Sequence, residues 1–165
     1  MDLRHATYPD HRAIKAAVPS WWSESRSPEQ AQVLSKLLPP LFLQHFASTS
    51  WIAEEDGELA GFVVGFHSAD RADEAYVHFT GVDPRLRGRG VGRSMYDRFF
   101  DQARAAGRTT IRAITSPHNT GSIAFHTAVG FAISPGDKEV DGVSVHGDYD
   151  APGEDRVCFV ATLAA

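Results

Sequence analysis

The pattern of hydrophobic and polar positions predicts strands and helices in alternation along the 165-residue chain. Short apolar or alternating runs bounded by turn residues are typical of strands, and apolar residues spaced three or four apart are typical of helices. The expected strands are 3–7, 51–54, 59–66, 74–82, 109–114, 131–134 and 157–163. The expected helices are 9–18, 27–38, 90–106 and 119–129, and residues 41–46 add a further turn or two.

Several element ends carry recognisable signals. Ser27, followed by Pro28 and then Gln30, predicts a capped helix start. Pro19 and the residues after it are expected to break the first helix. Residues 135–155 are polar and contain four glycines, so this segment is expected to be a long loop that is functional or mobile.

The element order predicts an α/β or α+β fold with a mixed sheet. A chain of 165 residues is expected to form one domain over its whole length, 1–165. Its 42% hydrophobic and 22% charged residues are ordinary for a globular protein.

Charge and composition exclude some classes of partner. The net charge of −5 argues against a nucleic-acid-binding surface, which is usually basic. No apolar run approaches the length of a membrane span, and the N-terminus lacks the apolar core of a signal peptide. A single cysteine, Cys158, fits a reducing compartment, so a cytoplasmic protein is expected. Cys158 itself is expected to be a buried small hydrophobic residue.

The stretch Arg87-Gly88-Arg89-Gly90-Val91-Gly92 is the most informative part of the chain. It follows a predicted strand and precedes a predicted helix. A glycine-rich turn in this position directs free backbone amides, and the positive end of the helix dipole, at an anion such as phosphate. The structural alternative is a tight strand-to-helix turn that binds no ligand.

Three phosphate-binding patterns compete for this stretch. The P-loop requires Gly-Lys-Ser/Thr, which the chain lacks. The dinucleotide fingerprint requires a third glycine where Arg93 stands. The acetyl-CoA loop, R/Q-x-x-G-x-G/A, is matched by Arg87, Gly90 and Gly92.

A second motif lies downstream, in Asn119-Thr120-Gly121-Ser122-Ile123-Ala124-Phe125-His126 and the following Gly130-Phe131. Together the two motifs resemble the GNAT superfamily of acyl-CoA-dependent N-acetyltransferases over residues 76–131. The resemblance implies a mixed, mostly antiparallel sheet of about seven strands flanked by about four helices. It also implies acetyl-CoA as the cosubstrate, with the pantetheine arm lying along the strand that precedes the glycine-rich loop.

The resemblance implies a set of cofactor-binding residues on the loop and on the second motif. They are Gly81, Val82, Arg87, Gly88, Arg89, Gly90, Val91, Gly92, Arg93, Asn119, Ser122 and Phe125. The main chain near Gly81 and Val82 would also stabilise the tetrahedral oxyanion. Asn119 has a structural alternative, since it is well placed to cap the helix that follows.

Three residues are candidates for proton transfer. His126 stands where the family usually has the tyrosine that protonates the leaving thiolate, and an imidazolium can take that role. Strand alternation places Glu74, Tyr76, His78 and Thr80 on one face, with Glu74 or His78 as the general base. Each also has a structural alternative, as a solvated charge or a packed histidine.

The acceptor side is less defined. Five residues lie where the family builds its acceptor wall, although ordinary core packing is the favoured explanation: Trp21, Trp22, Phe42, His45 and Phe46. The acidic run 148–155 lacks calcium-loop spacing, and no metal site is expected.

The sequence therefore predicts an N-acetyltransferase that moves acetyl from acetyl-CoA directly to a primary amine of a small molecule. A homodimer is compatible with the resemblance, and neither nucleic acid nor membrane is an expected partner. Two other classes stay open: a non-catalytic acyl-CoA-binding sensor and an anion-binding interaction module.

Overall fold

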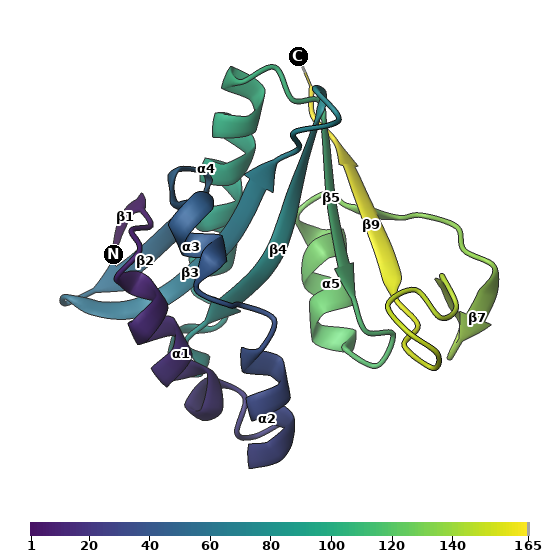
Figure 1. The fold of residues 1–165 in the computed structure, drawn as a ribbon, viewed down its shortest axis with the longest axis horizontal. Helices are drawn as coiled ribbons and strands as arrows, with labels where there is room; N and C mark the ends of the chain where they lie inside the picture. The colour runs from purple at the N-terminus through teal and green to yellow at the C-terminus, as the bar shows by residue number, and fades with distance from the viewer. Residues whose placement is uncertain (165) are drawn as a thin grey trace. The chain divides into compact units, whose positions relative to one another are not determined.

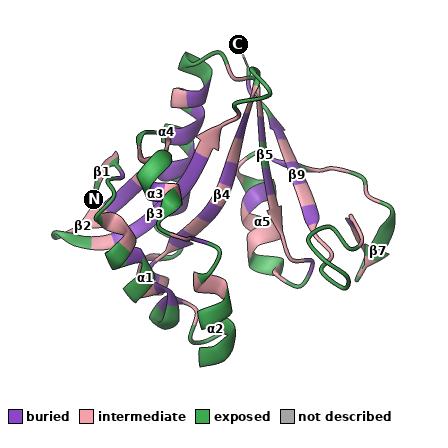
Figure 2. Ribbon diagram, viewed as in Figure 1, coloured by how far each residue is buried: buried purple, intermediate pink, exposed green. Residues whose placement is uncertain are grey.

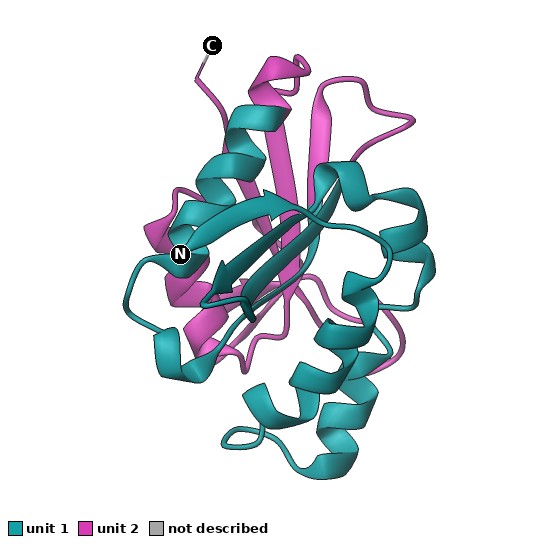
Figure 3. Cartoon of the chain, turned by 90° about the vertical axis from the view of Figure 1, so that its left-hand side faces the viewer, with its two compact units in different colours: residues 1–66, 77–102 teal, residues 67–76, 103–165 magenta. Residues whose placement is uncertain are grey.

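The computed structural model describes residues 1–164, which form two compact units (Figure 3). The first unit contains residues 1–66 and 77–102, and the second contains residues 67–76 and those from 103 onward. Within residues 1–164, none of the helices combines the length and apolar character needed to cross a membrane.

The strands follow the predicted order closely (Figure 1). They are β1 (Asp2–His5), β2 (Trp51–Glu55), β3 (Glu58–His67), β4 (Glu74–Val82), β5 (Thr110–Thr115), β6 (Ala132–Ile133), β7 (Lys138–Val140), β8 (Val143–Val145) and β9 (Val157–Thr162). The helices are α1 (Asp10–Trp21), α2 (Pro28–Ser35), α3 (Leu41–His45), α4 (Val91–Ala105) and α5 (Thr120–Ala128). Short 3₁₀ turns occupy Ala47–Thr49 and Pro84–Leu86.

Seven strands form one sheet in the order β1-β2-β3-β4-β5-β9-β6. β4 and β5 pair in parallel over Glu74–Tyr76, whereas β1–β2, β2–β3, β5–β9 and β6–β9 are antiparallel. This arrangement confirms the predicted mixed, mostly antiparallel sheet.

Two helices of the first unit differ in how well they were predicted. The start of α2 is confirmed, because the Ser27 side chain accepts from the Gln30 amide and the Gln30 side chain accepts from the Ser27 amide. The predicted break at Pro19 is wrong, since α1 continues to Trp21. Pro19 lies in the last turn, where few hydrogen bonds are lost, and Trp21 holds that turn by stacking on Phe62 at 5.9 Å.

Helices cover both faces of the sheet within the first unit. Phe62 of β3 belongs to a core cluster that includes Ile14 of α1 and Leu43 of α3. The residue before it, Gly61, faces the other way, where a Cβ would lie 2.9 Å from Met95 of α4. α1 and α3 therefore pack on one face and α4 on the other, and along α1 and α4 buried positions lie among exposed ones (Figure 2).

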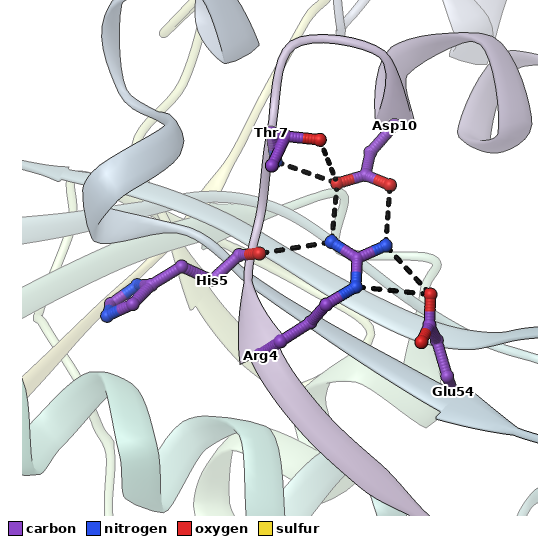
Figure 4. Close-up of polar contacts among 5 residues, drawn as sticks. All are labelled: Arg4, His5, Thr7, Asp10 and Glu54. Atoms are coloured by element: carbon purple, nitrogen blue, oxygen red, sulfur yellow. Dashed lines mark hydrogen bonds and ion pairs between the residues drawn. The ribbon is translucent and has the colours of Figure 1, made fainter.

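An ion-pair network ties the N-terminal strand to its neighbours (Figure 4). Arg4 of β1 donates two hydrogen bonds of 2.8 Å to the two oxygens of Asp10, at the start of α1. It also donates to Glu54 of β2 at 2.8 and 3.1 Å. Burial by itself would raise the pKa of Asp10, but the hydrogen bonds from Arg4 and Thr7 outweigh it and lower that pKa.

The predicted long loop 135–155 contains a β-hairpin, so that expectation was wrong. β7 and β8 pair antiparallel around Asp141 and Gly142, whose φ angles of 51° and 80° are both left-handed. This is the geometry of a two-residue hairpin turn that twists with its strands. The hairpin also packs tightly against Gly136, where a Cβ would collide with the carbonyl oxygen of Val145.

Candidate active site

The loop between β4 and α4 has the shape that phosphate binding requires. Gly88 and Gly90 adopt φ angles of 77° and 81°, and Cβ atoms there would meet no atom within 4 Å. Backbone conformation alone therefore accounts for these two glycines. The amide of Ser94 bonds to the carbonyl of Gly90 at 3.0 Å, which marks Gly90 as the residue from which α4 starts.

The N-terminus of α4 supplies donors and positive potential. Amides of the first helical turn have no partner within a helix, and a 15-residue helix adds the positive end of its dipole. Arg89 is on the loop and pairs with Glu55 at 3.1 Å. Arg87 extends toward the carbonyl oxygen of Trp21, at 3.5 Å. An anionic group can therefore dock against amides here, with arginines close in sequence.

Asp83 fixes the entry to this loop. Its carboxylate is 3% exposed in the folded chain and accepts hydrogen bonds from both the amide and the guanidinium of Arg85. These hydrogen bonds lower the pKa of Asp83 despite its burial. The amide of Asp83 bonds to the carbonyl of Ala60 at 2.9 Å, so the end of β4 stays attached to β3.

Gly81 is required by packing. A Cβ at this position would lie 2.6 Å from the ring of Phe62 and 2.8 Å from that of Trp22. The two aromatic rings therefore cover the backbone of β4 directly, immediately before the predicted oxyanion-binding residue Val82. The resemblance predicted Gly81 as a site residue. The need for a glycine at this position comes from the rings of Phe62 and Trp22, which are distant in the chain.

The alternation of β4 is interrupted between His78 and Phe79. Phe79 contacts Trp22 at 5.6 Å, and His78 contacts Phe42 of α3, so both face the side covered by α1 and α3. The hydroxyl of Thr80 bonds to that of Tyr96 of α4, on the opposite face, at 3.1 Å. The predicted single face for Glu74, Tyr76, His78 and Thr80 is therefore wrong at Thr80, because two successive side chains point the same way.

His78 is held rigidly on that face. Its ring stacks on Phe42 with centroids 4.0 Å apart and planes 1° from parallel. Nε2 donates to the carbonyl oxygen of Leu37, so Nδ1 carries the lone pair when the ring is neutral. Burial lowers the pKa of His78, more than the Leu37 hydrogen bond raises it. The ring is consequently a neutral proton acceptor near pH 7.

Glu74, the other base candidate, is engaged by Arg112. Nε and Nη2 of Arg112 each donate to one carboxylate oxygen at 3.1 Å, and Arg71 lies 3.9 Å away. This bidentate ion pair holds both oxygens of the Glu74 carboxylate in place. The sequence predicted a strand at Arg112 but not the partner of its side chain.

His126 is buried in an aromatic cluster. Its ring is 7% exposed and stacks on Phe159 at 4.6 Å, with Phe125 and Phe131 edge-on. Nδ1 lies 2.8 Å from the carbonyl oxygen of Ser122 and 3.1 Å from its hydroxyl. Burial lowers the pKa of His126, which favours a neutral ring near pH 7, and the acid role implied by the resemblance stays a prediction.

The remaining residues of the second motif form the start of α5. Oδ1 of Asn119 accepts from the amide of Ser122 at 3.1 Å, so the capping role of Asn119 is confirmed. Binding of the cofactor by Asn119, Ser122 and Phe125 stays a prediction.

The aromatic residues of the expected acceptor wall are mostly part of the core. Trp21 and Trp22 stack on Phe62 and Phe79, and Phe46 packs near Phe66 at 5.0 Å. Phe42 also packs against the core and contacts the candidate base His78. His45 is exposed.

The predicted site residues divide between the two units. His78 and the residues from Gly81 to Arg93 belong to the first unit, while Glu74, Asn119, Ser122, Phe125 and His126 belong to the second. In the described part of the chain, no three His, Cys, Asp or Glu side chains are grouped as a metal site would need.

Sequence comparison identifies relatives of known activity. The L-2,4-diaminobutyric acid acetyltransferase of Nocardia farcinica is 35% identical over 89 residues, which are 54% of this chain and 46% of that protein. The L-methionine sulfoximine/L-methionine sulfone acetyltransferase of Salmonella typhimurium is 29% identical over 85 residues, half of each chain. The chain thus spans about half the length of the curated relatives it matches.

Solved structures show the same fold. The PaiA N-acetyltransferase from Thermoplasma acidophilum, solved with coenzyme A, has a TM-score of 0.75 at 13% identity and 98% coverage of both chains. The ribosomal-protein-S18-alanine N-acetyltransferase from Escherichia coli has a TM-score of 0.67 at 16% identity, covering 99% of this chain and 96% of that one. The model of the acetyltransferase (GNAT) family matches residues 14–131. With the glycine-rich loop, the mixed sheet and this match, the chain belongs to the GNAT acetyltransferase family.

Proposed function

We propose that this protein is an N-acetyltransferase that moves acetyl from acetyl-CoA directly to a primary amine of a small molecule. The observation that carries the proposal is the loop from Gly88 to Gly92, with two left-handed glycines leading into the N-terminus of α4. Family membership and the coenzyme A complex of a protein with the same fold support acetyl-CoA as the cosubstrate.

The loop amides would hold the pyrophosphate, with Arg87, Arg89 and Arg93 supplying positive charge. To bind phosphate, Arg89 exchanges its ion pair with Glu55, an exposed interaction of small net stability. Asn119, Ser122 and Phe125 are the proposed contacts from the second motif. No metal is required by this arrangement.

In the proposed reaction, the acetyl group moves directly from the sulfur of acetyl-CoA to the nitrogen of the amine. The neutral amine attacks the thioester carbonyl, the carbon–sulfur bond breaks, and the ammonium proton must leave while the thiolate gains one. Main-chain amides near Val82 would stabilise the oxyanion. No acyl-enzyme is formed, and burial raises the pKa of Cys158, which disfavours a nucleophilic thiolate there.

His78 is the better supported of the two candidate bases. Its neutral ring offers Nδ1, because the hydrogen bond to the Leu37 carbonyl oxygen fixes the proton on Nε2. Glu74, in contrast, is bound at both oxygens by Arg112. The acid role of His126 stays a prediction, and its buried, neutral ring gives more support to a packing role.

The named relatives acetylate small amines, diaminobutyric acid and methionine sulfoximine among them, which supports a small-molecule acceptor. A cytoplasmic location and a homodimer stay predictions. The alternative function is an acyl-CoA sensor that binds the cofactor without turnover. A neutral His126 ring has no extra proton to give to the leaving thiolate, and this observation supports the sensor.

Two measurements test the proposal. Calorimetric titration with acetyl-CoA should give a measurable dissociation constant, and a thiol-release assay over an amine panel should find an acceptor. Binding without thiol release from any amine would favour the sensor. If the chain has no affinity for acetyl-CoA or coenzyme A, the proposal fails.

A further inference from the structure

The second unit contains a pocket of about 210 Å³ that the reaction above does not use. Its polar lining comes from β4, β5, β9 and the segments around the β7–β8 hairpin, and all these residues belong to one unit: Tyr76, Arg112, Ser134, His146, Tyr149 and Cys158. The volume is below the ~300 Å³ at which sites for drug-sized ligands begin, so the pocket suits a small head group.

The lining carries a single strongly charged side chain, Arg112. Burial raises the pKa values of Tyr76, Tyr149 and Cys158, which therefore stay neutral and protonated at pH 7. The nearby carboxylate of Asp150 pairs with Arg156 at 2.7 Å, and Arg156 also pairs with Glu154 at 3.0 Å. Because Arg112 is itself paired with Glu74, the ligand is selected by the hydrogen-bond donors of the lining and not by its net charge.

Arg112 is positioned before any ligand arrives. Glu74 holds its Nε and Nη2, and the side chain is 44% exposed. Nη1 has no hydrogen-bond partner among residues 1–164. A guanidinium held on one edge keeps planar donors on the other and loses little conformational entropy when it binds a carboxylate.

His146 provides an independent indication of a polar ligand. Its backbone exchanges hydrogen bonds of 2.9 and 3.1 Å with Arg156, which fixes the residue beyond the hairpin. The ring nitrogen Nε2 is buried and has no hydrogen-bond partner in the described chain. Buried polar atoms are nearly always satisfied, so this atom indicates a partner that the protein does not itself supply. Tyr149 packs edge-on against the ring at 6.2 Å.

We infer that this pocket binds a carboxylate of the acceptor, with Arg112 as the charged donor and His146 and Tyr149 as further hydrogen-bond donors. The acceptor is then a small amino acid and not a simple amine. This inference rests on the proposed function, because it assigns the carboxylate to the molecule that is acetylated. Carboxylate is the anion that matches both the planar donor edge and the small volume.

The test compares amino acids with their decarboxylated counterparts. Dissociation constants are measured by calorimetry and NMR titration, without acetyl-CoA, for a panel of α-amino acids that includes 2,4-diaminobutyrate, each paired with the corresponding amine, here 1,3-diaminopropane. The wild-type protein should bind at least one amino acid about 10- to 100-fold more tightly than its amine, as expected for hydrogen bonds to a charged group. Equal affinity across all pairs, or no binding by any amino acid, would overturn the inference.

Variants assign the effect to the pocket. Arg112→Gln should abolish the preference, and Arg112→Lys, which keeps the charge but loses the planar fork, should reduce it. Arg71→Gln is the matched control, since Arg71 also approaches Glu74, at 3.9 Å, but lies outside the pocket lining and is 71% exposed. Retained preference in a folded Arg112→Gln protein, verified by circular dichroism, would also overturn the inference.

Thiol release separates this inference from the proposed function. If carboxylate preference depends on Arg112 but no acceptor releases thiol, the transferase proposal fails and the binding site stands. If acetyl transfer proceeds with equal kcat/KM for amino acid and amine, the transferase proposal stands and the carboxylate pocket is refuted.

Discussion

Nε2 of His78 donates its hydrogen to the carbonyl oxygen of Leu37. A carbonyl oxygen only accepts, so this contact fixes which ring nitrogen carries the proton. Nδ1 is left as the site that can take a proton from an amine. A residue in the connection after α2 thus sets the chemistry available on β4.

Replacing His78 with phenylalanine tests this role. The ring can still stack on Phe42, so the fold should be kept, while the proton acceptor is lost. We expect kcat/KM to fall about 10²- to 10⁴-fold, with a much smaller change in acetyl-CoA affinity. Because burial lowers the pKa of His78 below 6.5, the wild-type rate should decline on the acid side of that value. The variant should lack this acid limb.

The exposed His5→Gln variant is the control and should behave as wild type. Unchanged turnover in His78→Phe would show that His78 is not the general base and would leave Glu74 as the candidate.

The two ends of α4 offer a matched pair of glycine variants. Gly90 and Gly107 have φ angles of 81° and 78°, and a methyl group added to either glycine would meet no atom within 4 Å. Alanine should cost each about 1–2 kcal/mol of stability through backbone strain. Only Gly90→Ala should also weaken acetyl-CoA binding, by about tenfold or more in calorimetry. Equal affinity in the two variants would show that the loop does not bind the cofactor.

Burial of His126 makes stability depend on pH. Since burial lowers its folded-state pKa below 6.5, the unfolded chain binds the proton first as the pH drops. The free energy of unfolding should therefore decrease below pH 6.5, with a slope of up to about 1.4 kcal/mol per pH unit from this residue. Urea titrations of wild type and His126→Phe between about pH 5 and 7.5 should show a shallower dependence in the variant.

The same variant separates the two roles of His126. If His126 is the acid, His126→Phe should lower kcat far more than it weakens acetyl-CoA binding. If the ring only packs on Phe159, turnover should survive, because phenylalanine preserves the aromatic stack.

The network around Arg4 is expected to stabilise the first unit. Asp10→Asn removes the charge that pairs with Arg4 and should cost about 1 kcal/mol, since Arg4 is partly exposed and its pairing is screened. The lowered pKa of Asp10 makes this contribution present above its ordinary value of 3.8 and lost as the pH falls below it. Thermal unfolding at about pH 7 and about pH 3 should show the difference mainly at the higher pH. Asp2→Asn is the control, because Asp2 lies on β1 together with Arg4. This variant should leave the thermal stability unchanged at either pH.

The sequence predicted what local signals determine. The bounds of β4, the capped start of α2 and the glycine-rich loop depend on residues within a few positions of one another, and all are confirmed as structure. Binding of acetyl-CoA by the glycine-rich loop stays a prediction, which the calorimetric titration with acetyl-CoA tests.

The misses have two origins. The hairpin of β7 and β8 was signalled by Asp141-Gly142 between two valines, but the polar surroundings obscured that signal. The Glu74–Arg112 pair, the Leu37–His78 contact and the interrupted alternation at Phe79 depend on packing between distant segments. Periodicity carries no information on such contacts, so the face of Thr80 was assigned wrongly.

The tight approach of Gly136 to Val145 constrains how acceptor choice can change. A single methyl group on residue 136 would collide with the backbone that leads directly into His146. Such a substitution would displace His146, which we infer to be a carboxylate donor, without altering any side chain of the pocket lining. In the inferred carboxylate pocket, acceptor selectivity would then depend on a position that itself has no side chain.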